Sequence, residues 1–217
     1  MKKAVILFVL MASVMFATSI CFAQTPFSDI QTHQALSDIE AVYSKGIMIG
    51  TAADIFSPDE YVDKAQLAVC LVRVFDLNYD NIAFAKLPVP SDLYDDVGND
   101  LWYSEASLTM AYNGIFDFPD RKFKPHQTVT RSEVAGAIAD SFKTKGIQVI
   151  TTMMWPPYAD IAHLPDKQQS DIAFIYNTQI MKYPGSEFKP DEKITRAELA
   201  TIMNNTLSSL ALAGEGS

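Results

Sequence analysis

The sequence predicts an all-α fold made of three helix–loop–helix repeats. A Phe-x-Pro triplet occurs three times, a four-residue pattern follows each triplet at a fixed distance, and apolar residues after that pattern recur at helical spacing. No run of alternating apolar and polar residues indicates a strand. We therefore expect each repeat to bury one apolar helix face against its neighbours.

The first 23 residues have the pattern of a secretory signal peptide. Two lysines at 2–3 precede an apolar run at 4–17, and residues 21–23 place small side chains at the positions that a signal peptidase reads. We expect cleavage after residue 23. An acylated Cys21 is the alternative, although Ile20 before it is larger than a lipoprotein signal normally has. Because the apolar run is too short to span a bilayer, and no later stretch is longer, we expect an exported protein without a membrane span.

Charge and cysteine content exclude several function classes. The chain has a formal net charge of −9, and removal of the two N-terminal lysines would make it −11. Nucleic acid is therefore not an expected partner, since phosphate binding needs a basic stripe. Cys70 is the only cysteine after residue 23, so we expect no intramolecular disulfide and a buried thiol. The three histidines lack metal-ligand spacing, and we expect no metal or other cofactor.

The repeat unit is defined by three features that occur in the same order. The predicted repeat cores span 27–75, 94–142 and 158–207, within segments 24–93, 94–157 and 158–217. Each unit opens with an aromatic residue two positions before an aspartate, then has the triplet, and then the four-residue pattern. The openings are Phe27-Ser28-Asp29, Tyr94-Asp95-Asp96 and Tyr158-Ala159-Asp160; the triplets are Phe56-Ser57-Pro58, Phe123-Lys124-Pro125 and Phe188-Lys189-Pro190; the patterns are Asp63-Lys64-Ala65-Gln66, Thr130-Arg131-Ser132-Glu133 and Thr195-Arg196-Ala197-Glu198.

Two helices are expected in each unit. The first ends at Gly46 in repeat 1 and at Gly114 in repeat 2, because glycine suits a left-handed helix C-terminus, whereas repeat 3 has Thr178 and Gln179 there. The second helix follows the four-residue pattern and carries an apolar stripe. The aligned stripe residues are Leu67, Leu71 and Phe75; Val134, Ile138 and Phe142; and Leu199, Met203 and Leu207.

The four-residue pattern has two interpretations that can both apply. Thr-x-x-Glu before an apolar helix is a capping box, in which the threonine hydroxyl and the glutamate satisfy backbone amides. The cation after the threonine is not explained in this way, since a positive charge at a helix N-terminus opposes the helix dipole. Lys64, Arg131 and Arg196 occupy this position. Free amides, the helix dipole and a cation together would form an anion site.

These combined features resemble the S-layer homology domain, whose pattern includes an aromatic-x-Asp opening, a Phe-x-Pro loop and an Ile-Thr-Arg-Ala-Glu helix start. The resemblance covers all three repeats. It implies a pseudo-threefold bundle with grooves between repeats, which binds a secondary cell-wall polysaccharide, commonly pyruvylated, and holds a secreted protein at the cell surface. The implied binding residues are Asp29, Asp96, Asp160, Lys64, Arg131, Arg196 and Trp102.

The repeats differ in how well they match that pattern. Arg131, Trp102 and Asp96 give repeat 2 the full set, so we expect them to contribute most to binding, with Arg196 second. We expect Lys64 to bind a carboxylate weakly or not at all. The aspartates can instead cap a helix or turn, and Trp102 can instead lie in the core.

An enzyme is the rival class. A carboxylate pair for glycan hydrolysis could be drawn from Asp95, Asp96, Glu105 and Asp160, but no acid and base are marked out and no nucleophile motif is present. We therefore expect a binding module and not an enzyme. Peptidoglycan itself, or another surface protein that contacts the apolar Met153–Trp155 segment, is the alternative partner.

Overall fold

The computed structural model describes residues 26–116, 120–151 and 153–214, so the predicted signal peptide lies outside the described residues. Within these ranges the chain is helical, with isolated β-bridges but no strand. The all-α prediction is therefore confirmed. The helices are α1 (Leu36–Ser44), α2 (Lys64–Phe75), α3 (Pro90–Leu93), α4 (Ser104–Tyr112), α5 (Arg131–Thr144), a short 3₁₀ turn η1 (Ala159–Ile161), α6 (Asp166–Asn177) and α7 (Arg196–Gly214).

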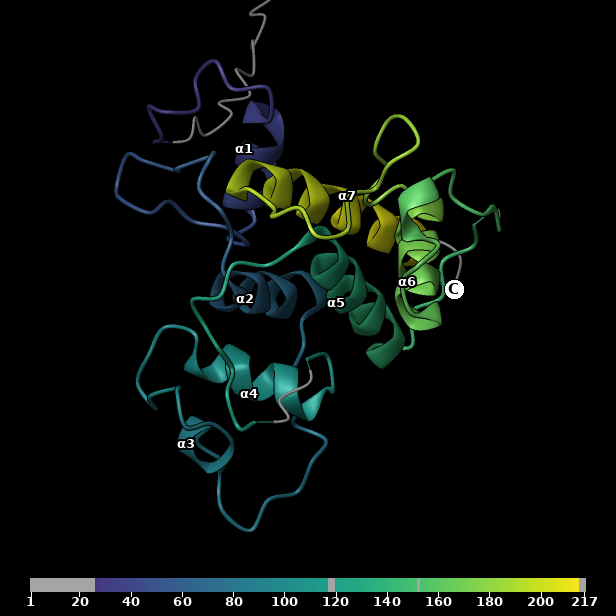
Figure 1. Cartoon of the computed structure of the whole chain (residues 1–217). Helices are drawn as coiled ribbons and strands as arrows, with labels where there is room; N and C mark the ends of the chain where they lie inside the picture. The colour runs from purple at the N-terminus through teal and green to yellow at the C-terminus, as the bar shows by residue number, and fades with distance from the viewer. Residues whose placement is uncertain (1–25, 117–119, 152, 215–217) are drawn as a thin grey trace, which may run out of the picture.

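The repeats pack in a closed ring, in which each second helix lies against the first helix of the next repeat. Helix α2 packs on α4, α5 packs on α6, and α7 returns to pack on α1 (Figure 1). Helix α2 also contacts α5 and α7. The apolar stripes predicted for α2, α5 and α7 meet the first helices in one continuous core that spans all three repeats.

Three backbone hydrogen bonds join the repeats where the second helices begin. The Val62 N–H donates to the Ile194 carbonyl (2.9 Å), the Ile194 N–H to the Val129 carbonyl (3.3 Å), and the Val129 N–H to the Val62 carbonyl (3.0 Å). The three side chains are fully buried. This cycle, here called the central ring, fixes the repeats around a pseudo-threefold axis.

The second helices begin as the capping pattern predicts. The Thr130 hydroxyl accepts from the Glu133 N–H, and the Glu133 carboxylate accepts from the Thr130 N–H (2.8 Å). Thr195 and Glu198 form the same box, and Asp63 accepts from the Gln66 N–H (2.8 Å). Helix capping is therefore confirmed in all three repeats, but the reciprocal box forms only at Thr130 and Thr195 among these three starts; in repeat 1 the Gln66 side chain accepts from Arg196 instead (3.0 Å).

Each Phe-x-Pro loop is held by the opening aspartate of its own repeat. The Asp96 carboxylate accepts from the Phe123 and Lys124 N–H groups (both 2.8 Å). Lys124 has φ of 56°, a left-handed conformation that an L-residue rarely adopts. Asp29 and Asp160 hold Phe56 and Phe188 in the same way, and the middle residues Ser57 and Lys189 also have positive φ. Because the phenylalanines are fully buried, the carboxylate stabilises a strained turn beside the core.

The first helices end in one conformation even where the sequence differs. Gly46 and Gly114 have φ of 67° and 64°, and Gln179 at the equivalent position of repeat 3 has φ of 62°. The side-chain amide of Gln179 donates to the Tyr176 carbonyl (3.1 Å), which is a contact that a glycine cannot make. Helix α7 continues to Gly214, beyond the predicted end of the repeat core at 207, and its added turns carry Leu210 against the core.

We expect Asp96→Ala to lower the free energy of unfolding by about 1–3 kcal/mol, because two backbone N–H groups at a strained turn lose their acceptor. Urea unfolding measures the change. Asp95→Ala is the matched control, since the Asp95 carboxylate pairs with Arg121 at an exposed site and should contribute less than about 1 kcal/mol. An unchanged midpoint for Asp96→Ala would contradict the role of the carboxylate as a clamp.

We expect the single thiol of residues 24–217 to be unreactive in the folded chain. Cys70 is buried against Ile47, and this burial raises the pKa of its thiol to about 12. Because the thiolate is the reactive species, a disulfide reagent at pH 8 should label Cys70 only after unfolding in guanidinium chloride. Rapid labelling without denaturant would show that this part of the core opens readily.

Candidate functional site

The N-terminal amides of the second helices are not free, so the expectation of an anion site built from them is wrong. In α5 the Arg131 N–H donates to the Glu192 carbonyl (2.9 Å) and the Ser132 N–H to the Pro190 carbonyl (3.0 Å). The first two amides of α2 and α7 donate to loop carbonyls of the next repeat in the same way. Since the capping side chains take the third amide, these helix ends are occupied by protein groups.

The cation at each helix start instead reaches into the next repeat around the ring. Lys64 lies over the Phe116 ring (5.4 Å), Arg131 over Tyr183 (4.2 Å) and Arg196 over Phe56 (4.6 Å). Burial lowers the pKa of Lys64, and the charge of Glu133 opposes that shift. The cations therefore connect repeats as well as carrying charge.

Arg131 is neutralised by two carboxylates. Its guanidinium donates to Glu192 (2.8 Å) and Glu198 (3.1 Å), and also to the Phe188 carbonyl (3.2 Å). Burial opposes the charge, but Tyr183 and the two carboxylates outweigh it, so the pKa of Arg131 lies above its ordinary value. The Arg131 Nε is buried without a hydrogen-bond acceptor in the described residues.

Arg196 has only neutral partners. Its guanidinium donates to the Phe56 carbonyl (2.9 Å), the Gln66 side-chain oxygen (3.0 Å) and the Ile49 carbonyl (2.7 Å). No carboxylate of the described residues lies within ion-pair distance of it. Burial lowers the pKa of Arg196, yet an arginine stays charged in proteins. The chain therefore holds a buried cation without a direct carboxylate partner: only 5% of Arg196 is exposed, and Glu60, Asp29 and Asp63 act on it from beyond ion-pair distance.

Arg196 lines a cavity of about 370 Å³ that also contains Trp102, here called groove A. The cavity lies between the turn at 47–51, helix α2 of repeat 1 and the start of repeat 2. Its charged lining residues are Arg196 and Arg73, with no carboxylate among the described lining. Trp102 is 63% exposed, so it is not a core residue.

A second cavity of about 610 Å³, here called groove B, lies between repeats 3 and 1. It is lined by the 180–183 turn, by α7, and by His33 and Gln34, which precede α1 as Trp102 precedes α4. Its lining includes four carboxylates and two lysines. The carboxylates are Asp38, Asp59, Glu192 and Glu198, and the lysines are Lys182 and Lys193. Groove B is therefore acidic where groove A is basic.

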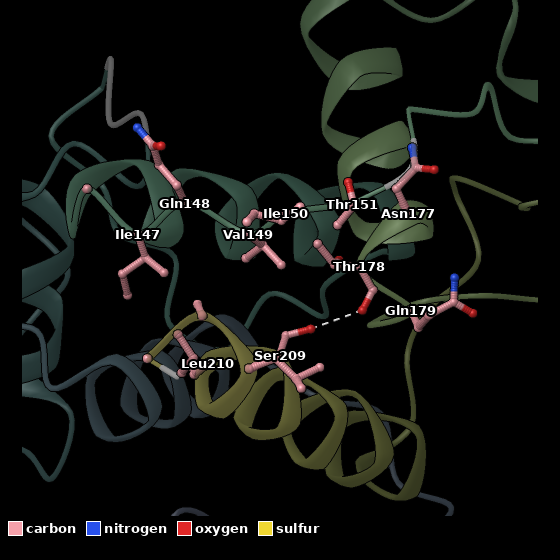
Figure 2. A pocket seen from close by; sticks show the side chains of 14 residues that line it. Ile147, Gln148, Val149, Ile150, Thr151, Asn177, Thr178, Gln179, Ser209 and Leu210 are labelled. Atoms are coloured by element: carbon pink, nitrogen blue, oxygen red, sulfur yellow. Dashed lines mark hydrogen bonds between the residues drawn. The ribbon is translucent and has the colours of Figure 1, made fainter. Parts of the chain in front are cut away.

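A third cavity of about 920 Å³ lies beside the C-terminal ends of α6 and α7 (Figure 2). Its lining within the described residues carries no charged side chain, and Ser209 donates to the Thr178 carbonyl across it (3.0 Å). Ile150 on its rim and Met153 nearby are almost fully exposed, and Trp155 is also exposed. The described residues of this surface thus offer no cation to an anionic ligand.

The structure brings together some of the predicted site residues and separates others. Arg196 and Trp102 share groove A, whereas Arg131 lies behind the acidic side of groove B. Asp29, Asp96 and Asp160 face their own loops. The sequence did not predict that Gln66 and Glu192 line the grooves. The one signal for Gln66 was that glutamine stands where the patterns of repeats 2 and 3 have glutamate.

Among the described residues, no cluster of histidine, cysteine, aspartate and glutamate could hold a metal ion. No helix in the described part of the chain is long and apolar enough to cross a membrane.

Curated proteins with similar sequence are longer than this chain and include surface-layer proteins and an exoglucanase. The chain is 24% identical over 179 residues to the Surface-layer 125 kDa protein of Lysinibacillus sphaericus, covering 79% of this chain and 14% of that protein. It is 28% identical over 124 residues to S-layer protein EA1 of Bacillus anthracis, and this match covers 57% of this chain and 14% of that protein. It is 24% identical over 187 residues to exoglucanase XynX of Acetivibrio thermocellus, and this match covers 83% of this chain and 16% of that protein. The chain thus spans less than a fifth of the length of each of these relatives.

The family comparison matches the same three units that the fold displays. The S-layer homology domain model matches residues 26–68, 93–135 and 157–200, which begin at the three opening motifs and end inside α2, α5 and α7. Together with the S-layer relatives, these matches indicate a protein of the cell surface or cell wall. With a family match in each of its three repeats, the chain belongs to the S-layer homology domain family.

Proposed function

We propose that this protein binds an anionic cell-wall glycan non-covalently and without catalysis, and that groove A is the main binding site. The observation that carries the proposal is that an arginine without an ion-pair partner and an exposed tryptophan line one inter-repeat cavity. Family membership supports a role in anchoring to the cell wall. The glycan that fits best is a secondary polysaccharide with a carboxylate substituent, such as a pyruvyl ketal.

The chemistry of groove A matches such a ligand. Three of the five N–H groups of Arg196 have acceptors in the described residues, which leaves two for a ligand carboxylate. A charge-assisted pair in a buried site is stronger than one in water. The exposed indole of Trp102 offers a flat apolar surface on which a pyranose ring can stack.

The other predicted residues support the site indirectly in this proposal. Asp29 fixes the loop that carries Phe56, and the Arg196 guanidinium lies over the Phe56 ring. Asp96 and Asp160 hold the corresponding loops of repeats 2 and 3. Arg131 and Lys64 are secondary in this ranking, because Arg131 is paired with two carboxylates and Glu133 acts on Lys64.

The partners of the candidate catalytic carboxylates support a non-catalytic function. Asp95 pairs with Arg121, and Glu105 accepts from the Tyr79 hydroxyl (2.8 Å). Asp96 and Asp160 are engaged by backbone N–H groups of separate repeats. A glycosidase needs two carboxylates that face one bond, whereas each of these four is engaged by a different partner.

We expect Trp102→Ala to weaken binding to cell walls about tenfold or more, because stacking on the sugar is lost. Residues 24–217 would be sedimented with sacculi purified from the organism that produces the chain. Trp155→Ala is the matched control: Trp155 is 64% exposed, like Trp102, but lies outside groove A, so its loss should leave binding unchanged. Equal weakening by both substitutions would contradict the placement of the site.

A second sedimentation experiment identifies the wall component. We expect binding to untreated sacculi and a loss of binding to sacculi from which hydrofluoric acid has stripped the secondary polysaccharide. Equal binding to both preparations would assign peptidoglycan as the ligand and contradict the polysaccharide. Binding to neither would overturn the anchoring function and favour a protein partner.

A further inference from the structure

We propose that Gln66 determines which groove of this protein binds an anionic ligand, because its neutral amide occupies the position where repeats 2 and 3 place a glutamate against the helix-start cation. The inference rests on the proposed function and concerns the specificity of the same site. Gln66 acts on the ligand through Arg196, so it is a positioning and charge-setting residue.

The three repeats share one geometry at this contact. Each second helix begins with a cation, and in repeats 2 and 3 that cation donates to the third residue of the second helix in the next repeat. Arg131 donates to Glu198 (3.1 Å), and Arg196 donates to Gln66 (3.0 Å). Lys64 is similarly under the charge of Glu133. The same hydrogen bond is therefore made in the two arginine sites, with a charged acceptor in one and a neutral acceptor in the other.

Glutamine in place of glutamate changes the charge of the site but keeps its hydrogen bonds. Gln66 retains the hydrogen bond to Arg196, and its backbone N–H retains the cap on Asp63 (2.8 Å). In repeat 1 the acidic residue of the four-residue pattern is Asp63. One oxygen of its carboxylate caps α2, and the other contacts His126 of repeat 2 (3.3 Å). Repeat 1 thus keeps an acid for helix capping while it leaves the Arg196 guanidinium unneutralised.

The linings of the two grooves differ in the same sense. Glu60, Asp29 and Asp63 partly offset the charge of Arg196 from beyond ion-pair distance, but none of them lines groove A, where Arg73 adds a second positive charge. In groove B, Glu198 is joined by Glu192 on Arg131, with Asp38 and Asp59 also in the lining. An anionic sugar would be attracted to groove A and repelled from groove B.

The test uses calorimetric titration of residues 24–217 with two probes. One is the polysaccharide that hydrofluoric acid releases from the organism's own sacculi, and the other is that polysaccharide after reduction of its carboxylates to alcohols. We expect Gln66→Glu to weaken binding of the native polysaccharide about tenfold or more, because the new carboxylate neutralises Arg196. Its affinity for the reduced polysaccharide should equal that of the unsubstituted chain.

Two further variants separate charge from folding. Gln66→Met is similar in size and uncharged, so it should keep most of the affinity for the native polysaccharide. The double variant Glu192→Gln, Glu198→Gln frees Arg131 while an amide oxygen can still cap α7, and it should bind more native polysaccharide at saturation. The midpoint of thermal unfolding of Gln66→Glu should not fall, since an ion pair replaces a neutral hydrogen bond.

The outcomes distinguish this inference from the proposed function. If the unsubstituted chain binds neither probe, the proposed function fails and the inference fails with it. If the unsubstituted chain binds and Gln66→Glu binds the native polysaccharide equally well, only the role of Gln66 is overturned. Weak binding by Gln66→Met and Gln66→Glu alike would also overturn it, since shape and not charge would then be the cause.

Discussion

The central ring of hydrogen bonds is the constraint on which the rest of this structure depends. Val62, Val129 and Ile194 each donate to the preceding repeat around the ring, and directly beyond them the first amides of each second helix donate to loop carbonyls of the next repeat. No repeat satisfies these groups by itself, because the acceptors belong to another repeat. Unlike a linear array, in which the end repeats have one neighbour, this ring gives every repeat two neighbours and leaves no terminal unit to be capped.

The ring also explains why the helix-start cations are tolerated. A cation at a helix N-terminus is unfavourable in isolation. Here the helix ends are covered by protein carbonyls, and the cation extends away toward an aromatic ring and an acceptor in the next repeat. The energetic role of the cation is therefore to join repeats. Its availability to a ligand depends on the acceptor that it meets: two carboxylates for Arg131, but carbonyl oxygens and a glutamine for Arg196.

This arrangement concentrates positive charge in a strongly acidic protein. The chain carries a net charge of −9, yet the described lining of groove A has two arginines and no carboxylate. Because the cation is removed from water, its interaction with a ligand anion is less screened than on the surface. The exposed Trp102 completes a site in which a charged substituent and a sugar face could be recognised together.

The sequence by itself determined the features that depend on local order: the two helices of each repeat, the capping boxes at Thr130 and Thr195, the left-handed helix ends at Gly46 and Gly114, and the buried Cys70. These follow from spacing along one chain segment. Only the tertiary structure decided that the helix amides are occupied, that the opening aspartates clamp loops, and that Trp102 meets Arg196 and not Arg131. The physical reason is that each groove combines residues from different repeats. The closed ring packs α7 of repeat 3 against α1 of repeat 1, and this contact cannot be inferred from the distance between the two helices along the sequence.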